Sequence, residues 1–319
     1  MLKLENDKER LKTTKANYVF WNKIFLAIEL TDYTEGMFNG DPDTPIDVAQ
    51  LNQINYVLDE VECRKGVRIL EVGCGNGHLL EEIRKRGADG IGITISPEEV
   101  AFCVQRGLDV RLLNYRDIGD EWTHQFDAVI ANGSVEHFVQ AKEASQTLDD
   151  TIYRNFFEIC RRVINPKSNI KKMINTTIFF VRKPDPRNLL KSPFAFSWGS
   201  DNFHWSMLNK SFAGWYPAEG QLERCAKDYF DLVKTVDGTY DYHLTSEHWL
   251  RRVKKAFTDF RELPKFIKFI RAFLSVLIRH PVHTLTMTAC CMVTQSWEWQ
   301  FRPPNPPTKL LRQTWKYRG

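Results

Sequence analysis

The sequence lacks any cysteine pattern that would hold a metal or form a redox pair. No two of its cysteines form a CxxC motif, so neither a zinc site nor a thioredoxin-type motif is expected. An odd, scattered set indicates reduced thiols, and we therefore predict a cytoplasmic protein without a metal centre. The seven cysteines are Cys63, Cys74, Cys103, Cys160, Cys225, Cys290 and Cys291.

Long apolar runs and a strong charge imbalance are also missing. The first 15 residues are charged and contain no apolar core, which argues against a secretory signal. The most apolar late stretch, 266–278, contains Lys268 and Arg271 and is too short and too charged to span a bilayer. A net charge of +4 is too mild to indicate nucleic-acid binding, although it suits a protein that visits anionic membranes.

What the chain does contain is an alternation of short apolar strands and amphipathic helices. Strands are expected at 67–72, 90–94, 110–113, 126–131 and 172–181, with a further strand at 231–237. Strands separated by helices predict an α/β fold with a doubly wound, mostly parallel, Rossmann-like sheet. We expect an N-terminal helical segment and lid (1–62), a core (63–181), an aromatic-rich insertion (182–225), further core and helices (226–301), and a Pro-rich basic tail (302–319), partly disordered.

The strongest motif is the run EVGCGNG at 71–77, which follows a strand and opens a helix. Its glycines permit a tight turn and let a ligand lie against bare backbone, while the next helix offers unpaired N–H groups. The spacing is GxGxG, not the GxGxxG of dinucleotide enzymes, and Glu71 precedes the first glycine by two positions. This pattern favours S-adenosylmethionine over a nicotinamide nucleotide.

Two later strand ends carry further candidate residues. Ser96, with Glu99 three positions on, has the form of a helix capping box, and the same strand end places Thr94 and Glu99 near the ribose of a bound nucleotide. The two interpretations of Glu99 do not exclude each other. The fourth strand ends at Glu136 and His137, which are either catalytic acid–base groups or a surface pair.

Taken together, these motifs resemble the cyclopropane-fatty-acid synthase family, which includes the mycolic acid cyclopropane synthases and, more distantly, plant coclaurine-type N-methyltransferases. The resemblance runs from about residue 32 to 249. It rests on YTEGMF at 33–38, the glycine loop at 71–77, the run 92–96, YRD at 115–117, EHF at 136–138, the Tyr216-Pro217 pair and DYHLTSEHW at 241–249.

The resemblance implies S-adenosylmethionine as cofactor and a class I methyltransferase fold. The implied cofactor contacts, with neighbouring residues of the same motifs, are Tyr33, Thr34, Glu71, Gly73, Cys74, Gly75, Gly77, Thr94, Ser96, Glu99, Tyr115 and Arg116.

The resemblance also implies catalytic positions. In the synthases a Cys, a Glu, a His and a Tyr hold a bicarbonate ion that serves as the base. The Glu corresponds to Glu136 and the Tyr to Tyr242, whereas the Cys position is Glu35 and the His position is Asn175. A fixed carboxylate beside bicarbonate would bring two like charges together. We therefore expect Glu35 to take the place of the ion and to act as the base with Glu136, hydrogen-bonded by Tyr242 and Asn175.

The methyl acceptor is less constrained by the sequence. An aromatic-rich run between 194 and 216 suits either an acyl chain or an aromatic small molecule, or it forms a lid over the cofactor. Basic apolar helices between 263 and 279 either pack on the core or lie on an anionic membrane. We expect an unsaturated lipid acyl chain. A small-molecule N- or C-methyltransferase, with Glu35 or His137 as base, and a fold that has lost catalysis are the alternatives. The aromatic residues are Phe194, Phe196, Trp198, Phe203, Trp205, Phe212, Trp215 and Tyr216.

Overall fold

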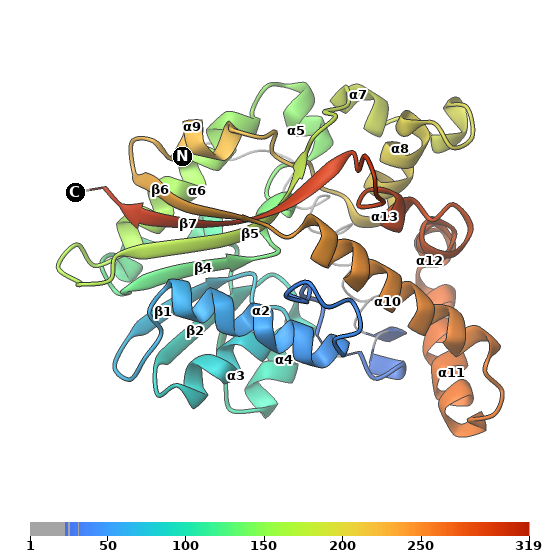
Figure 1. Ribbon diagram of the computed structural model, residues 1–319, viewed down its shortest axis with the longest axis horizontal. Coiled ribbons are helices and arrows are strands. Elements are labelled where there is room, and N and C mark those ends of the chain that lie inside the picture. The colour runs from blue at the N-terminus through green and yellow to red at the C-terminus, as the bar shows by residue number, and fades with distance from the viewer. Residues whose placement is uncertain (1–22, 25, 31, 319) are drawn as a thin grey trace.

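A seven-stranded mixed sheet forms the centre of the protein (Figure 1). The computed structural model describes residues 23–24, 26–30 and 32–318, so the first 22 residues of the predicted N-terminal helical segment lie outside the described residues. The strand order is β3-β2-β1-β4-β5-β7-β6, in which β1 to β5 pair in parallel and β7 pairs antiparallel with both β5 and β6. The predicted doubly wound, mostly parallel sheet is confirmed.

The predicted strands differ from the observed ones by no more than two residues at either end. Buried parallel strands read as nearly continuous apolar runs, which is why the sequence marks them well. Their bounds are β1 Arg68–Val72, β2 Asp89–Thr94, β3 Asp109–Leu112, β4 Ala128–Asn132, β5 Lys172–Phe180 and β6 Phe230–Asp237.

Helices cover both faces of the sheet and create two separate apolar cores. One face packs against α2 (Ile46–Glu60), α3 (His78–Lys85) and α4 (Pro97–Gln105), whose buried side chains form one cluster with β1. The other face packs against α6 (Asp149–Val163) and α9 (Gln221–Ala226). Short helical pieces, η1 (Tyr115–Asp117), η3 (Val135–His137) and α5 (Ala141–Ser145), follow β3 and β4.

A second group of helices lies at one end of the sheet (Figure 1). The predicted insertion supplies α7 (Pro186–Leu189), η4 (Pro193–Ala195) and α8 (Asp201–Phe212). The chain between β6 and β7 supplies α10 (Thr239–Thr258), α11 (Leu263–Arg279), α12 (Pro281–Thr288) and α13 (Ser296–Trp299). Among the described residues, no helix combines the length and the apolarity that crossing a bilayer requires.

The C-terminal tail is where the structure corrects the sequence analysis. Residues expected to form a partly disordered basic tail make β7, Thr308–Tyr317, which lies between β5 and β6. Leu310, Arg312 and Trp315 are almost fully buried. The polar and basic composition of this segment suggested an exposed tail. A strand that is paired on both sides can nevertheless bury polar residues, because partners distant in sequence satisfy their hydrogen bonds.

Candidate functional site

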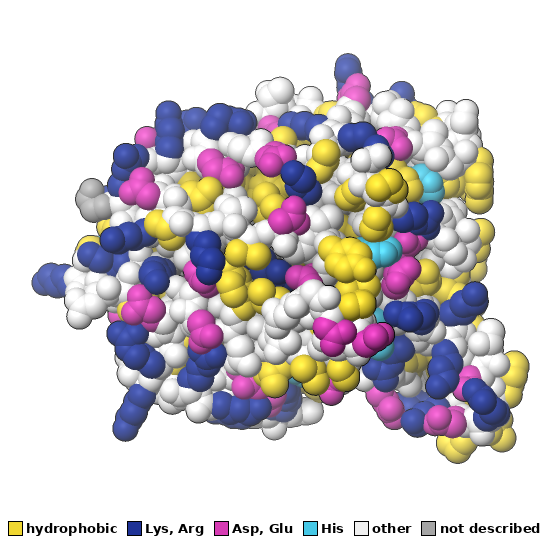
Figure 2. Space-filling model, in the orientation of Figure 1, with side chains coloured by type: hydrophobic (Ala, Val, Ile, Leu, Met, Phe, Trp, Pro, Cys, Tyr) yellow, Lys and Arg dark blue, Asp and Glu magenta, His cyan; other side chains and the backbone are white. Residues whose placement is uncertain are grey.

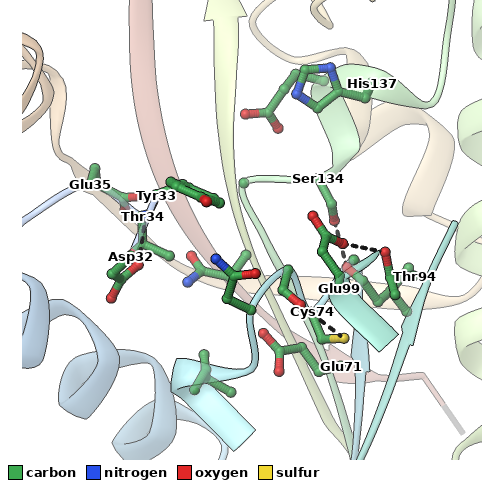
Figure 3. A pocket seen from close by; sticks show the side chains of 18 of the residues that line it. Asp32, Tyr33, Thr34, Glu35, Glu71, Cys74, Thr94, Glu99, Ser134 and His137 are labelled. Carbon is green, nitrogen blue, oxygen red and sulfur yellow. Dashed lines mark hydrogen bonds between the residues drawn. The ribbon is translucent and has the colours of Figure 1, made fainter. Parts of the chain in front are cut away.

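A cavity opens at the carboxyl ends of β1, β2 and β4, beneath the second group of helices. Figure 3 shows Asp32 to Glu35 on one side of it, Thr94 and Glu99 on the opposite side, and Glu71 in its floor. Most of the predicted site residues meet here, although they come from several separate segments. The carboxyl ends of parallel strands are the usual place for a ligand in such a sheet.

The three glycines of the loop have different structural tasks. Gly75 has a positive φ of +50°, and a Cβ placed on it would meet no atom within 4 Å, so its backbone faces open space. At Gly73 a Cβ would lie 2.7 Å from the Cβ of Ser134, and at Gly77 it would lie 2.7 Å from Leu108. Gly75 therefore leaves room for a ligand, whereas Gly73 and Gly77 permit close packing.

Glu71 places an unsatisfied carboxylate beside this loop. Its side chain is buried, and its Oε2 atom accepts no hydrogen bond from the part of the chain that the structure describes. Burial raises the pKa of Glu71 well above its usual value. Because a buried acceptor without a partner is costly, this oxygen favours a ligand that brings a donor or a positive charge.

At the end of β2, Thr94 and Glu99 face the cavity but Ser96 does not. Thr94 Oγ1 donates a 2.5 Å hydrogen bond to Glu99 Oε2, which orients this carboxylate. Ser96 Oγ accepts from the backbone N–H of Glu99 at 3.3 Å, so the helix-capping interpretation of Ser96 is confirmed. Its predicted contact with the cofactor is not supported.

The segment before α2 forms a lid over the loop. Tyr33 and Thr34 line the cavity, and the Tyr33 hydroxyl hydrogen-bonds to Asn76 of the glycine loop. Tyr115 also lines the cavity, but Arg116 points away from it. Arg116 Nη2 donates to the carbonyl of Phe138 at 2.8 Å, so Arg116 holds the chain after β4, and its contact with the cofactor stays a prediction.

Glu35 lies in the lid with its carboxylate almost fully buried. Its Oε1 accepts hydrogen bonds from Gln53 Nε2 at 3.2 Å and from Arg312 Nε at 3.4 Å. Burial raises the pKa of Glu35, and the Arg312 guanidinium opposes that rise. The arrangement presents a buried carboxylate, next to a fixed positive charge, at the edge of the cavity.

Sequence reasoning missed Arg312, whose guanidinium contacts the Glu35 carboxylate. It is fully buried on β7, donates to Asp241 Oδ2 at 3.0 Å and to the carbonyl of Gly36 at 3.2 Å, and so ties α10 to the lid. Gly238 makes room for it, because a Cβ there would lie 2.7 Å from the Arg312 Cζ. No local motif marks Arg312, since its partners are more than 70 residues away.

Glu136 and His137 line the cavity from η3. Burial raises the pKa of Glu136 to about 8, and the Glu35 carboxylate adds to the rise. Burial lowers the pKa of His137 to about 4. At neutral pH, Glu136 therefore holds a proton and His137 is uncharged. Glu136 Oε2 has no hydrogen-bond partner in the described protein.

The two remaining catalytic candidates have different outcomes. Tyr242 lines the cavity and packs against Phe301 with ring centroids 4.3 Å apart. Asn175 does not reach the cavity, because its Oδ1 accepts from Trp315 Nε1 at 2.6 Å and its Nδ2 donates to Thr177 at 2.9 Å. The predicted support of Glu35 by Asn175 is therefore wrong. Successive residues of a strand face opposite sides, so a one-residue difference in register moves a side chain away from the site.

The aromatic run only partly lines the cavity. Phe212 and Tyr216 reach it, joined by Trp249 and Trp297 from other helices, which the sequence analysis did not assign. Phe203, Trp205 and Trp215 are buried in the core. Phe194 and Trp198 are 79% and 66% exposed and contribute nothing to the cavity wall. One end of the cavity is consequently apolar, while the glycine-loop end is polar.

Comparison with known proteins gives one family and one fold. The family model described as mycolic acid cyclopropane synthetase matches residues 5–278. The cyclopropane-fatty-acyl-phospholipid synthase of Escherichia coli K12 is 32% identical over 97 residues, an alignment that spans 29% of this chain and only 24% of that synthase.

Solved structures show the same architecture. The mycolic acid cyclopropane synthase CmaA1, complexed with SAH and CTAB, superposes with a TM-score of 0.71 at 17% identity, over 99% of both chains. The cyclopropane synthase MmaA2 from Mycobacterium tuberculosis gives 0.68 at 15% identity, over 97% of this chain and 98% of that one. These superpositions confirm the class I methyltransferase fold.

Proposed function

The chain belongs to the mycolic acid cyclopropane synthetase family, and we propose that it is an S-adenosylmethionine-dependent methyltransferase that acts on an unsaturated acyl chain of a lipid. One observation carries this proposal. A single cavity joins an open glycine loop, the buried carboxyl groups of Glu35 and Glu136 and an apolar, aromatic end. These are the parts that a methyl donor, a proton-accepting step and a hydrocarbon acceptor require.

The residues around the loop fit S-adenosylmethionine. The orphaned Glu71 carboxylate suits the amino-acid ammonium, and Gly75 leaves its backbone free for close approach. Glu99, oriented by Thr94, is set to accept from the ribose hydroxyls, while Tyr33 closes the lid. When bound, this cofactor supplies a strongly electrophilic methyl group.

Glu35 is the proposed base. Methylation of an alkene requires that a proton leave the acceptor, and a positioned carboxylate takes it efficiently. Arg312 favours the charged form of Glu35, whereas no guanidinium of the described residues pairs with Glu136, whose pKa of about 8 keeps it protonated. A carboxylate that faces a cation and a carboxyl group that keeps its proton can take different roles. Glu136 thus donates a hydrogen bond while Glu35 accepts the proton.

This assignment makes bicarbonate unnecessary. Arg312 already pairs with the carboxylates of Glu35 and Asp241, so this buried guanidinium has two negative partners. An additional anion there would meet repulsion in a site of low dielectric. We propose turnover that does not depend on added bicarbonate.

The acceptor is placed at the apolar end of the cavity. Phe212, Trp249 and Trp297 offer aromatic faces that bind hydrocarbon and stabilise positive charge developing on it. A lipid acceptor also implies peripheral contact with the cytoplasmic face of a membrane. A small-molecule N- or C-methyltransferase is the second candidate, because the Glu35 carboxylate or the neutral His137 is equally suited to take a proton from an amine.

Mass spectrometry distinguishes these candidates. Purified protein with S-adenosylmethionine is incubated with unsaturated phospholipid or with a panel of soluble amines. We expect the acyl chain to gain one CH2 unit, since a methyl group arrives and a proton leaves, and Glu35→Gln to abolish the gain. Methylation of an amine with no change in the lipid would overturn the lipid assignment while retaining the methyltransferase.

A further inference from the structure

A stripe of exposed apolar side chains runs along α11 and continues onto α12. Leu263, Ile267, Leu274 and Ile278 repeat at intervals of four and seven residues, which puts them on one side of the helix. Their exposed fractions reach 80% at Ile278, and Val282 at the start of α12 is 78% exposed. An apolar surface of this kind marks an interaction site.

The stripe is distinct from the face that holds α11 to the protein. Phe269 and Val276 are buried on another side of the helix, and the Phe269 ring packs edge-on against Phe257 of α10 at 4.7 Å. The helix is thus anchored by one apolar face and presents a second to solvent. Packing on the core, the simpler explanation of an apolar helix, accounts only for the first face.

The charged residues of α11 and α12 themselves are all basic, and the carboxylates of Glu29 and Glu262 pair with Lys265 at the start of α11. From residue 263 to residue 293 the sequence contains no Asp or Glu. Lys268, Arg271 and Arg279 are exposed, and no carboxylate of the described residues pairs with them. Figure 2 shows hydrophobic side chains along the rim formed by α12 and α11, with Lys and Arg side chains beside them.

The same helices adjoin the apolar end of the cavity. α12 contacts α8, and α11 contacts α10. Phe212 of α8 and Trp249 of α10 line the cavity. A partner that binds to α11 and α12 would therefore lie next to α8 and α10, the helices that line the apolar end of the cavity.

We propose that α11 and α12 form a docking surface for anionic phospholipid bilayers, with the apolar stripe inserted among the acyl chains and Lys268, Arg271 and Arg279 at the headgroups. Apolar burial and attraction to anionic lipid act together in such interfacial helices. A second copy of the chain is a poorer occupant, because it would bring the unpaired Lys268, Arg271 and Arg279 of two copies together. The proposal deepens the proposed function and rests on it only for the identity of the acceptor.

Co-sedimentation of the full chain with vesicles tests this surface without any need for turnover. We expect binding to vesicles of phosphatidylcholine and phosphatidylglycerol, weak binding to phosphatidylcholine alone, and release by added salt. Leu274→Glu with Ile278→Glu should weaken binding about tenfold or more, and Lys268→Glu with Arg271→Glu by a similar factor.

The matched control is Val104→Glu, which puts the same charge on a 56% exposed apolar residue of α4 and should leave vesicle binding unchanged. Circular dichroism confirms that each variant is folded. Equal binding by all folded variants would overturn the proposal, as would a dimer in light scattering that Ile278→Glu dissociates while vesicles remain unbound.

Turnover on acyl chains dispersed in detergent separates the two hypotheses. If the docking surface is right, the Leu274→Glu with Ile278→Glu variant keeps activity in detergent and loses it on vesicles. If vesicles bind as described but neither form of lipid is methylated, the surface stands and the proposed acceptor fails.

Discussion

The two walls of the cavity are assembled in different ways. The glycine-loop wall takes Glu71, Gly75, Thr94 and Glu99 from a stretch of fewer than 30 residues. The opposite wall joins Glu35 to Arg312, which is 277 positions away. The first wall depends on local backbone conformation, and the second depends on the sheet bringing distant segments together. Substitutions on the two walls should therefore fail in different ways.

The largest effect is expected at Gly75. Gly75→Val places a branched side chain in the open space beside the loop and forces it into a positive φ. Isothermal titration calorimetry should show binding of S-adenosylmethionine falling below detection. Gly66→Val is the matched control, because Gly66 also has a positive φ with no atom near its Cβ but lies outside the cavity. Equal affinities of the two variants would contradict a ligand at Gly75.

On the opposite wall, Glu35→Gln should reduce turnover about 10²–10⁴-fold, as expected for loss of a positioned base. Cofactor affinity should remain near that of the parent, which separates the two walls experimentally. Turnover is measured in bicarbonate-depleted buffer before and after the ion is restored. Many-fold stimulation of the parent by bicarbonate would show that an ion, and not Glu35, is the base.

Removal of the Arg312 guanidinium should mainly lower the free energy of unfolding. Arg312→Met leaves Glu35 buried without its cation and removes the partner of the partly exposed Asp241, and breaking a buried pair costs about 3–5 kcal/mol. Urea denaturation measures the change in unfolding free energy. Arg111→Met, which breaks an ion pair at a 58% exposed arginine, should cost no more than about 1 kcal/mol. If both variants lose equally little, Arg312 does not hold the wall together.

A smaller effect is expected from the proton on Glu136. Between pH 6.5 and 8 the folded protein keeps a proton on Glu136, whose pKa is about 8, while the unfolded chain has released it. Stability then falls as pH rises, by at most about 1.4 kcal/mol per pH unit. His137, with a pKa of about 4, acts with the opposite sign and only below pH 6.5.

Glu136→Gln should therefore flatten the decline in unfolding free energy between pH 6.5 and 8, measured by urea denaturation across that range. Comparison of variant and parent removes the contributions of Glu35 and Glu71, because both proteins share them. A decline that is equally steep in the variant would mean that Glu136 is already ionised in the folded protein.

The local signals explain which predictions succeeded. The strands were predicted within two residues because a buried parallel strand is a short apolar run, and the cap at Ser96 was predicted because its partner is three residues away. The motif of Arg116 lies near the site, but its side chain turns to the carbonyl of Phe138. The position of a motif indicates which part of the fold its residues occupy, whereas the direction of each side chain depends on the residues that pack around it.

By itself, the sequence determined the α/β class, the parallel half of the sheet and the glycine loop, because each is encoded by residues that are neighbours along the chain. Only the tertiary structure decided that the C-terminal residues 308–317 form a strand inside the sheet, between β5 and β6, that Asn175 faces away from the cavity and that Glu35 has Arg312 as its partner. The physical reason is that a buried charge is tolerated only where a counter-charge meets it. For Glu35 that counter-charge comes from the far end of the chain, and the sheet alone brings the two together.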